Sequence, residues 1–523
     1  MTHHRLQAKN LLVSLIVVLM VGSIAGASDS DAATASHVFE AIGSNASFPS
    51  SSTAAARNGY VVLQAWQTER MHELKRQNPN LKVLVYKNLG FSAQGAGPEG
   101  KYSSGVGYEQ AKPAWFLKNT SGQSFTGENY SWLWAMDVGN REYQEKWAEN
   151  VVGELTSEGW DGVELDDACG TMKYHYDPSK IAKYPSDAKY AAAMESALAY
   201  IGPKIMATGK LAIPNFACWV EEPAMYNSWL QYVSGGIDEM FVKWGSAAGE
   251  GYRGSYQWQV QVEEARYANQ HGKVFIGFTQ GAVGDTQAAR YGYASLLMGS
   301  ESAALSSYAY TPDYETEQWL PEYEYELGAP TEAATEGSGG VFHRQFTDGL
   351  VLVNPTSSAR TVSFGGTYSG SGLENATSAT LQPDSALVLS GQSAPPVAEA
   401  PPVSTPEAPP VKPKPTPKPV EVGPITVGPI GVTVTTGESG IALSWTSGAP
   451  AATTYEVIRD QQPQAKTTQR HRKEPTVKRG KSYSFRIVGL NRGGKVVARS
   501  RDFVAKASAK HRRTVVQAPT KVS

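Results

Sequence analysis

Short hydrophobic runs alternate with amphipathic stretches through the first part of the chain, from residue 36 to residue 311. Eight of these runs have the length and the β-branched and aromatic content of strands: 60–66, 81–87, 131–137, 160–166, 210–216, 237–243, 273–279 and 304–310. Helical patterns lie between most of them, over 141–158, 187–208 and 256–271. Eight β/α units in about 250 residues predict an α/β fold, a (β/α)8 TIM barrel over residues 36–330. A doubly wound open sheet is the alternative, although no Gly-rich phosphate loop follows an early strand.

The pattern changes to β throughout after the predicted barrel. Residues 336–392 alternate apolar and polar positions between turn residues, which predicts a small antiparallel β-domain. Residues 393–422 hold 11 prolines between Pro395 and Pro419, a composition typical of an extended spacer. Alternation returns over 423–508 and predicts a β-sandwich, and we expect the basic residues 509–523 to form a disordered tail.

The predicted sandwich resembles a fibronectin type III module. The likeness rests on Trp445, Tyr455, Tyr483 and the turn Asn491-Arg492-Gly493-Gly494. It covers residues 423–508 and implies a C-terminal fibronectin type III-like domain.

The N-terminus has the three parts of a secretory signal peptide. Arg5 and Lys9 precede the apolar run Leu11–Val21, and small residues end at Ala27. This order predicts cleavage after residue 27 and a secreted, extracellular protein without a membrane anchor, the alternative being an uncleaved anchor.

The formal net charge of −2 conceals an acidic body and a basic C-terminus. Residues 393–523 contain 21 Lys and Arg against 8 Asp and Glu, whereas the rest of the chain contains 26 against 41. We expect the basic part to attach the protein to an anionic cell-surface or cell-wall polymer, because export disfavours nucleic acid as the partner. A solvated tail without a ligand is the alternative.

The composition limits the other classes of site. With two cysteines, neither a disulfide framework nor a four-cysteine zinc site can form. Cys169 and Cys218 follow neighbouring predicted strands, so they are either bridged or two buried thiols. The nine histidines show no paired ligand spacing, and we expect neither a metal nor a cofactor.

In a TIM barrel the active site lies at the carboxyl ends of the strands. Polar or aromatic residues lie at or just beyond most of the predicted ends. We expect these to bind substrate: Trp66, Lys87, Asp137, Asn215, Trp219, Lys243 and Gln280.

The richest of these ends is the segment Trp160-Asp161-Gly162-Val163-Glu164-Leu165-Asp166-Asp167. Because side chains alternate along a strand, Glu164 and Asp166 should point into the barrel, with Asp166 nearer the mouth. Close carboxylates shift each other's pKa apart, which suits one for an ionised role and another for proton donation. We therefore take Asp166, Glu164 and Asp167 as catalytic candidates, Asp167 being equally consistent with a capping role.

This segment resembles the bacterial hypothetical glycosyl hydrolase family 15. The running order NPNLKVLVYKN, PAWFLKNTSGQSF, AMDVGNREYQEKWAENVV and WDGVELDDA carries the likeness, which spans residues 59–310. The resemblance implies a barrel related to alpha-galactosidase-like and polygalactosaminidase-like enzymes, with the acid that ends the fourth strand, here Asp166, as nucleophile. For the proton donor we favour Glu221 and Glu222 over Glu239, which strand alternation would place deep in the barrel.

Carbohydrate is the expected substrate. Eleven of the twelve tryptophans lie between Trp66 and Trp319, and aromatic rings bury the C–H faces of sugars. We therefore expect a secreted glycoside hydrolase that acts on a polysaccharide or oligosaccharide with carboxylate acid/base chemistry. The alternative is a catalytically inactive carbohydrate-binding or cell-wall-associated barrel, and a second carboxylate facing Asp166 would distinguish the two.

Overall fold

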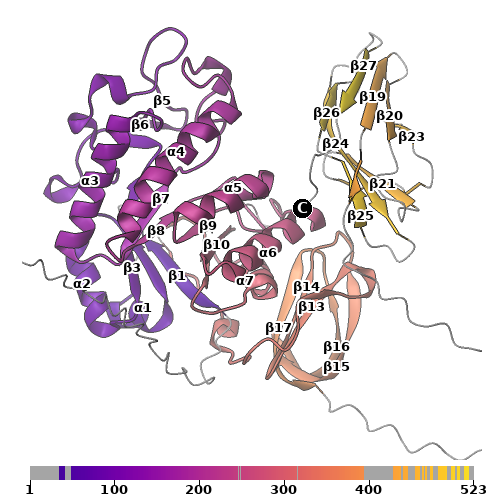
Figure 1. Ribbon diagram of the computed structural model, residues 1–523. Coiled ribbons are helices and arrows are strands. Elements are labelled where there is room, and N and C mark those ends of the chain that lie inside the picture. The colour runs from indigo at the N-terminus through magenta and orange to yellow at the C-terminus, as the bar shows by residue number, and fades with distance from the viewer. Residues whose placement is uncertain are drawn as a thin grey trace, which may run out of the picture.

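The computed structural model describes residues 35–41, residues 49–393 except 246, 248 and 315, and the strands and short stretches around them between 428 and 516. The predicted signal peptide, and the predicted linker apart from its first residue, lie outside the described residues. Figure 1 shows a barrel, an antiparallel β-domain and a C-terminal module.

Eight parallel strands form the barrel. In chain order they are β1 (Ser36–Ala41), β2 (Tyr60–Leu63), β3 (Lys82–Asn88), β7 (Gly162–Asp166), β8 (Leu211–Pro214), β9 (Gly235–Asp238), β10 (Val274–Gln280) and β11 (Ser306–Thr311). Hydrogen bonding follows the order β8-β7-β3-β2-β1-β11-β10-β9. A parallel bridge between Asn215 and Ile237 brings the two ends together, and Phe216 N donates to Ile237 O at 2.8 Å. The predicted TIM barrel is confirmed.

Two of the strand predictions need correction. The first barrel strand is β1, which no predicted run covered, and the run 131–137 is not a barrel strand. It forms β6 (Tyr130–Ala135), which pairs antiparallel with β4 (Phe91–Ala93) and β5 (Thr126–Gly127) in an insertion between β3 and the next helix. Since one strand is gained and one lost, the segment ending at Asp166 is still the fourth barrel strand.

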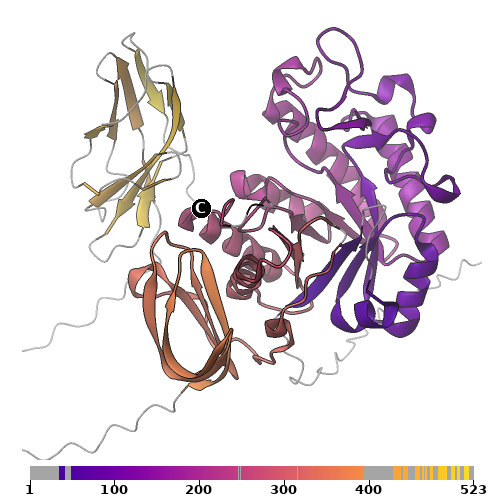
Figure 2. The ribbon, with the colours of Figure 1, turned by 180° about the vertical axis from the view of Figure 1, so that it is seen from behind.

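Within the described residues, seven α-helices accompany the barrel. Figure 2 shows the barrel and its helices from behind. They are α1 (Ser51–Arg57), α2 (Thr68–Gln77), α3 (Arg141–Glu158), α4 (Asp187–Met206), α5 (Pro223–Trp229), α6 (Ser255–Gln270) and α7 (Thr286–Gly299). Strand alternation separates two cores. Val83, Val85, Val163 and Leu165 pack outward against the helices, whereas Val62, Leu84, Ile213 and Ile276 fill the barrel. Within the described residues no helix is long and apolar enough to cross a membrane.

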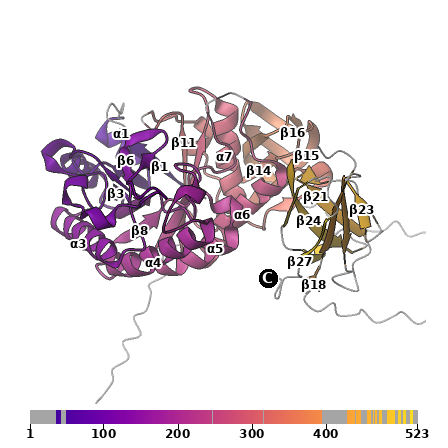
Figure 3. The same cartoon turned by 90° about the horizontal axis from the view of Figure 1, so that it is seen from above.

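The antiparallel β-domain shares its core with the barrel. Its strands are β12 (Thr335–Glu336), β13 (Phe342–Phe346), β14 (Gly349–Asn354), β15 (Arg360–Gly370), β16 (Leu373–Leu381) and β17 (Ser385–Ser393). Figure 3 shows α7 between β11 and β14, and Phe346, Val351 and Val388 belong to the same buried cluster as Tyr291 and Leu297 of α7. The domain is therefore packed onto the barrel rather than suspended from it.

The C-terminal module consists of two sheets around its own core. Its strands are β18 (Gly428–Pro429), β19 (Val432–Gly437), β20 (Gly440–Trp445), β21 (Thr454–Arg459), β22 (Gln462–Pro463), β23 (His471–Lys473), β24 (Ser482–Leu490), β25 (Val496–Arg499), β26 (Phe503–Lys506) and β27 (Arg512–Val516). Val434, Leu443 and Trp445 of one sheet share a cluster with Val457, Phe485 and Ile487 of the other, which confirms the predicted β-sandwich. The fibronectin type III assignment stays a prediction. The prediction of a disordered tail over 509–523 was wrong for residues 512–516. They form β27, which pairs antiparallel with β19 and so extends that sheet.

We expect Arg344→Leu to destabilise the barrel and the β-domain together. Arg344 on β13 is only 2% exposed and donates to the carbonyls of Leu297, Met298 and Ser300 at the end of α7. Leaving these carbonyls buried without donors should cost about 2–4 kcal/mol. Urea unfolding of the full chain measures the loss. Arg266→Leu, which breaks an exposed ion pair with Glu263, is the control and should cost less than about 1 kcal/mol. Equal effects of the two substitutions would contradict the shared core.

Candidate active site

Five polar side chains from four neighbouring strands meet at the carboxyl end of the barrel. Tyr86 and Asn88 end β3, Asp166 ends β7, Asn215 follows β8, and Glu239 follows β9. Tyr86 packs against the inner core of the barrel, so this set of alternating residues points inward. The strand order therefore gathers residues that are far apart in the sequence.

Asp166 is surrounded by hydrogen-bond donors. The Tyr86 hydroxyl donates to Oδ2, the Asn215 amide donates to Oδ1 at 3.0 Å, and the backbone N–H of Asp167 donates to Oδ1 at 2.8 Å. Asn88 makes a longer contact with Oδ2, at 3.4 Å. Donors that converge on both oxygens favour the ionised carboxylate, which is the form that a nucleophile needs.

Glu239 is the second carboxylate. Its Oε2 accepts from the Asn215 amide at 2.8 Å, and its Oε1 accepts from the Tyr314 hydroxyl. Because one amide nitrogen contacts both acids, the two oxygens concerned lie no more than about 6 Å apart, near the separation typical of retaining glycosidases. The prediction that Glu239 lies deep in the barrel was wrong, because β9 ends at Asp238, one residue before it.

Asp167 pairs with a histidine from the loop after β7. His175 Nε2 lies 2.8 Å from Oδ1, and the Asn88 amide donates to Oδ2 at 2.6 Å. Asp167 adopts φ +54°, in the left-handed region that non-glycine residues seldom use. Strained backbone of this kind is concentrated at functional sites, and here it aims consecutive carboxylates at different partners.

The electrostatics of the cluster are those of crowded acids. Burial, and then the charges of Asp167 and Glu239, raise the pKa of Asp166 to about 7. Burial also raises the pKa of Glu239, although hydrogen bonds from Tyr314 and Asn215 oppose the shift. For His175, burial lowers the pKa, but the hydrogen bond and charge of Asp167 outweigh it, so the pKa is raised. Two buried acids whose pKa values are both raised fit acid/base catalysis near neutral pH.

The other predicted catalytic residues lie elsewhere. Glu164 is buried in the barrel, two residues before Asp166 on the same strand face. Glu221, in the single-turn helix η5 (Trp219–Glu221), accepts from the Tyr174 hydroxyl at 2.6 Å and forms an ion pair with Lys173. Glu222 is exposed at the start of α5.

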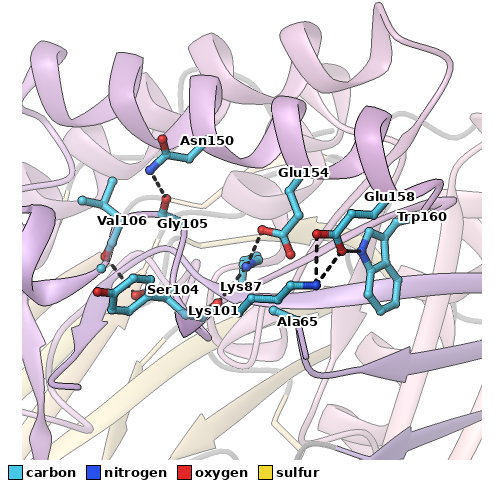
Figure 4. Close-up of polar contacts among 12 residues, drawn as sticks. Ala65, Lys87, Lys101, Ser104, Gly105, Val106, Asn150, Glu154, Glu158 and Trp160 are labelled. Carbon is cyan, nitrogen blue, oxygen red and sulfur yellow. Dashed lines mark hydrogen bonds and ion pairs between the residues drawn. The ribbon is translucent and has the colours of Figure 1, made fainter. Parts of the chain in front are cut away.

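Three predicted substrate-binding residues are held by other parts of the protein. Lys87 points outward, where its Nζ contacts Glu154 of α3 and the Tyr102 carbonyl, both at 2.7 Å (Figure 4). Lys243 Nζ donates to the carbonyls of Gly245, Ala247 and Gln280. Asp137 follows β6 rather than a barrel strand, and it accepts from Lys183 and Tyr184.

The other predicted substrate-binding residues lie in the core or at the end of a strand. Trp219 is buried against Phe216 and Phe275, so it is a core residue rather than a wall for sugar. Trp66 is half-buried beside the backbone of Gly97. Gln280 ends β10, and its backbone carbonyl accepts from Lys243. Of the seven, Asn215 alone makes hydrogen bonds with the carboxylate pair among the described contacts.

In the part of the chain that the structure describes, no three His, Cys, Asp or Glu side chains are arranged to hold a metal ion.

Comparisons with known proteins single out one family. A family model described as hypothetical glycosyl hydrolase family 15 matches residues 75–350. No protein with a curated description matches the sequence. Among solved structures, the glycoside hydrolase domain of PelA from Pseudomonas aeruginosa is 14% identical over 54% of this chain and 96% of its own, with a TM-score of 0.36. The maltogenic alpha-amylase AmyB from Thermotoga neapolitana is 11% identical over 68% and 98%, with a TM-score of 0.40.

Asp166→Asn should make the stability of the protein less dependent on pH between pH 5 and 8. Because the folded state raises the pKa of Asp166 to about 7, the folded protein binds more protons than the unfolded chain between about pH 4 and 7. The parent therefore loses stability as the pH rises through this range, and the variant should lose less. Each kcal/mol corresponds to roughly 2–4 °C in Tm for a domain of this size. Thermal unfolding from pH 5 to 8 measures the difference.

The matched control for this experiment is Asp348→Asn, at an exposed position of the β-domain. Its Tm should follow that of the parent at every pH. A difference between Asp166→Asn and the parent that stays constant from pH 5 to 8 would show that Asp166 does not have the raised pKa.

We expect Cys169 and Cys218 to form a disulfide bond under oxidising conditions. They follow β7 and β8, and their sulfur atoms lie 2.6 Å apart without a covalent bond, closer than two thiols in simple contact. With oxidised glutathione, the two thiols lose two protons and two electrons, so the intact mass should fall by about 2 Da. Immediate alkylation of both cysteines in denaturant without reductant would contradict the bridge, and Cys169→Ser provides the unbridged control.

Proposed function

Because the chain belongs to hypothetical glycosyl hydrolase family 15, we propose that it hydrolyses glycosidic bonds with Asp166 as nucleophile and Glu239 as general acid. The observation that carries this proposal is the Asn215 amide, which donates to both carboxylates. Two acids held at this separation on one mouth of a barrel are the minimum that retaining glycoside hydrolysis requires. The alternative, an inactive sugar-binding barrel, gives no reason for a second acid here.

The first step would form a covalent intermediate. The ionised Asp166 attacks the anomeric carbon while Glu239 gives its proton to the departing glycosidic oxygen, so the C–O bond breaks as the new bond to Asp166 forms. Tyr86 and Asn215 keep one Asp166 oxygen each in place during the attack. The leaving sugar departs as a neutral alcohol, and Glu239 is left as a carboxylate.

In the second step Glu239 takes a proton from water, and the resulting hydroxide attacks the anomeric carbon and releases Asp166. Two inversions at that carbon give net retention. Glu239 ends protonated, as it began, so protons balance over the cycle. A raised pKa of Glu239 suits this alternation between acid and base.

Asp167 and His175 would act as positioning residues. Asp167 raises the pKa of His175, and the protonated imidazole would balance part of the negative charge in the cluster. Asn88 joins Asp167 to Asp166 through its amide. This set fixes the orientation of the nucleophile without touching the sugar.

We further propose that the enzyme is exported and held near a surface. The signal-peptide pattern of residues 1–27 supports export, and the excess of basic over acidic residues in 393–523 supports attachment to an anionic cell-wall polymer. The substrate would then be a polysaccharide or oligosaccharide within reach of that surface.

The test is hydrolysis of a panel of bacterial and plant polysaccharides by the full chain without its first 27 residues. Asp166→Asn and Glu239→Gln should each lower the release of reducing ends by about 10²–10⁴-fold. Glu221→Gln is the matched control and should keep its activity, since Glu221 is paired with Lys173. NMR of the first product should show the anomeric configuration of the substrate.

Activated substrates separate the two roles. A glycosyl fluoride has a leaving group that needs no proton, so it should restore the first step in Glu239→Gln but not in Asp166→Asn. Unchanged activity of Glu239→Gln on natural glycans would exclude Glu239 as the acid. Inversion of configuration would exclude the covalent intermediate, and no hydrolysis of any glycan by the parent would favour the inactive barrel.

A further inference from the structure

The described residues include four exposed large apolar side chains: Tyr130, Trp132, Tyr174 and Val283. Three of them are aromatic and lie on adjoining segments, because the Glu128 N–H donates to the His175 carbonyl at 2.8 Å. Trp132 is 53% exposed and Tyr130 is 41% exposed. A group of aromatic rings left in water is the kind of surface that marks a binding site.

These rings lie on the insertion between β3 and α3. Alternation along β6 places Tyr130, Trp132 and Trp134 on one face of that strand. Trp134 is fixed by a hydrogen bond to Gln94 and by contact with Tyr108. The centroids of Tyr130 and Trp132 are 5.5 Å apart, and in Figure 1 β5 and β6 lie above β7.

The row of rings leads directly to the carboxylates. The ring of Tyr130 lies 6.0 Å from that of His175, whose Nε2 is 2.8 Å from Asp167. Burial, and then the charges of Glu239, Asp167 and Asp166, raise the pKa of Tyr130. Trp132 therefore contacts Tyr130, and Tyr130 contacts His175 at the edge of the catalytic cluster.

The backbone that carries these rings and a neighbouring aromatic pair are tied to the rest of the insertion. The Gln94 N–H donates to the Trp132 carbonyl at 2.8 Å, and Phe125 stacks on Tyr176 with centroids 3.9 Å apart. A preformed surface loses little conformational entropy on binding. Tyr174 is not part of this surface, because Lys173 lies over its ring and its hydroxyl donates to Glu221.

The charges next to these rings restrict the ligand. Asp166, Asp167 and Glu239 face one histidine, and the neighbouring Lys173 is paired with Glu221. A sugar chain that carries carboxylates would be repelled at this mouth. Sugar rings without carboxylates can stack their C–H faces on the aromatic rings and leave their hydroxyl groups in water.

We propose that Tyr130 and Trp132, whose ring planes meet at 89°, form a stacking site for sugar rings of a carboxylate-free polysaccharide. The inference rests on the proposed function and adds its substrate class, a polymer bound beyond the sugar that is cleaved. An enzyme with such a site prefers long substrates to short ones, because binding energy from remote sugars lowers the barrier at the reacting bond.

Binding is measured separately from catalysis, in the full chain without its first 27 residues and with Asp166→Asn. Affinity electrophoresis and calorimetry use a neutral glucan, a galactan and a mannan, chitosan, and two polyuronates, polygalacturonate and alginate. At least one carboxylate-free polymer should bind, and Trp132→Ala should weaken that binding about tenfold or more, with a smaller loss for Tyr130→Ala. Trp132→Phe keeps a ring and should retain most of the affinity.

Val283→Ala is the matched control, because it removes exposed apolar surface without removing a ring, and it should bind as its parent does. The Tm of each variant verifies folding. Equal affinity of Trp132→Ala and its parent, binding to polyuronates alone, or no binding to any carboxylate-free polymer would overturn the stacking site.

Hydrolysis distinguishes this inference from the proposed function. In the active background, Trp132→Ala should reduce kcat/KM for polymer and leave the rate on an aryl monosaccharide unchanged. If the Asp166→Asn protein binds polymer through Trp132 but the parent hydrolyses nothing, the proposed function fails and the binding site stands. If the parent hydrolyses polymer and Trp132→Ala does so equally well, the binding site fails and the proposed function stands.

Discussion

The closed parallel sheet is the constraint on which the active site depends. All eight strands point the same way, so each contributes its carboxyl end to one mouth, and alternation decides which side chain points inward there. Asp166, Asn215 and Glu239 are separated by up to 73 residues in the sequence, yet one amide contacts both acids. The backbone hydrogen bonds that close the sheet run between β8 and β9, the strands after which Asn215 and Glu239 follow.

The same closure explains why the acids are tolerated. Three carboxylates in a confined mouth repel each other, and burial adds to the cost of ionising them. Hydrogen-bond donors from different elements offset this repulsion. They are Tyr86 and Asn88 from β3, Asn215 after β8, and Tyr314 after β11. His175 contacts Asp167, whose hydrogen bond and charge raise the pKa of the imidazole and favour its cationic form. The cluster is thus a balance between repelling acids and shared donors, because Asn88 and Asn215 each contact two of the acids, and burial still keeps the pKa of Asp166 raised, at about 7.

The sequence predicted the barrel, the fourth-strand acid and the order of the domains because these depend on periodicity and local motif. It misassigned the run 131–137, because an exposed strand of an insertion has the same alternation as a barrel strand. Lys87 was expected at the mouth, but it lies between the inward-facing Tyr86 and Asn88 and therefore points toward α3. The depth of Glu239 depended on where β9 ends, and pattern alone rarely fixes strand ends. Tyr314 and His175 come from loops, which carry no periodic signal.

Arg344 has a consequence for how such proteins are assembled in evolution. Its guanidinium donates hydrogen bonds to the carbonyls that end α7, and β14 and β17 pack on the same helix. The barrel and the β-domain should therefore be inherited together as one unit. Recombination can exchange the chain beyond residue 393 without exposing this junction. A recombination point at residue 336 would remove the β-domain, which would expose one face of α7 and leave its last carbonyls without the hydrogen bonds from Arg344. A replacement of the C-terminal module would therefore keep the contacts of Arg344 intact, whereas the β-domain has to stay with its barrel.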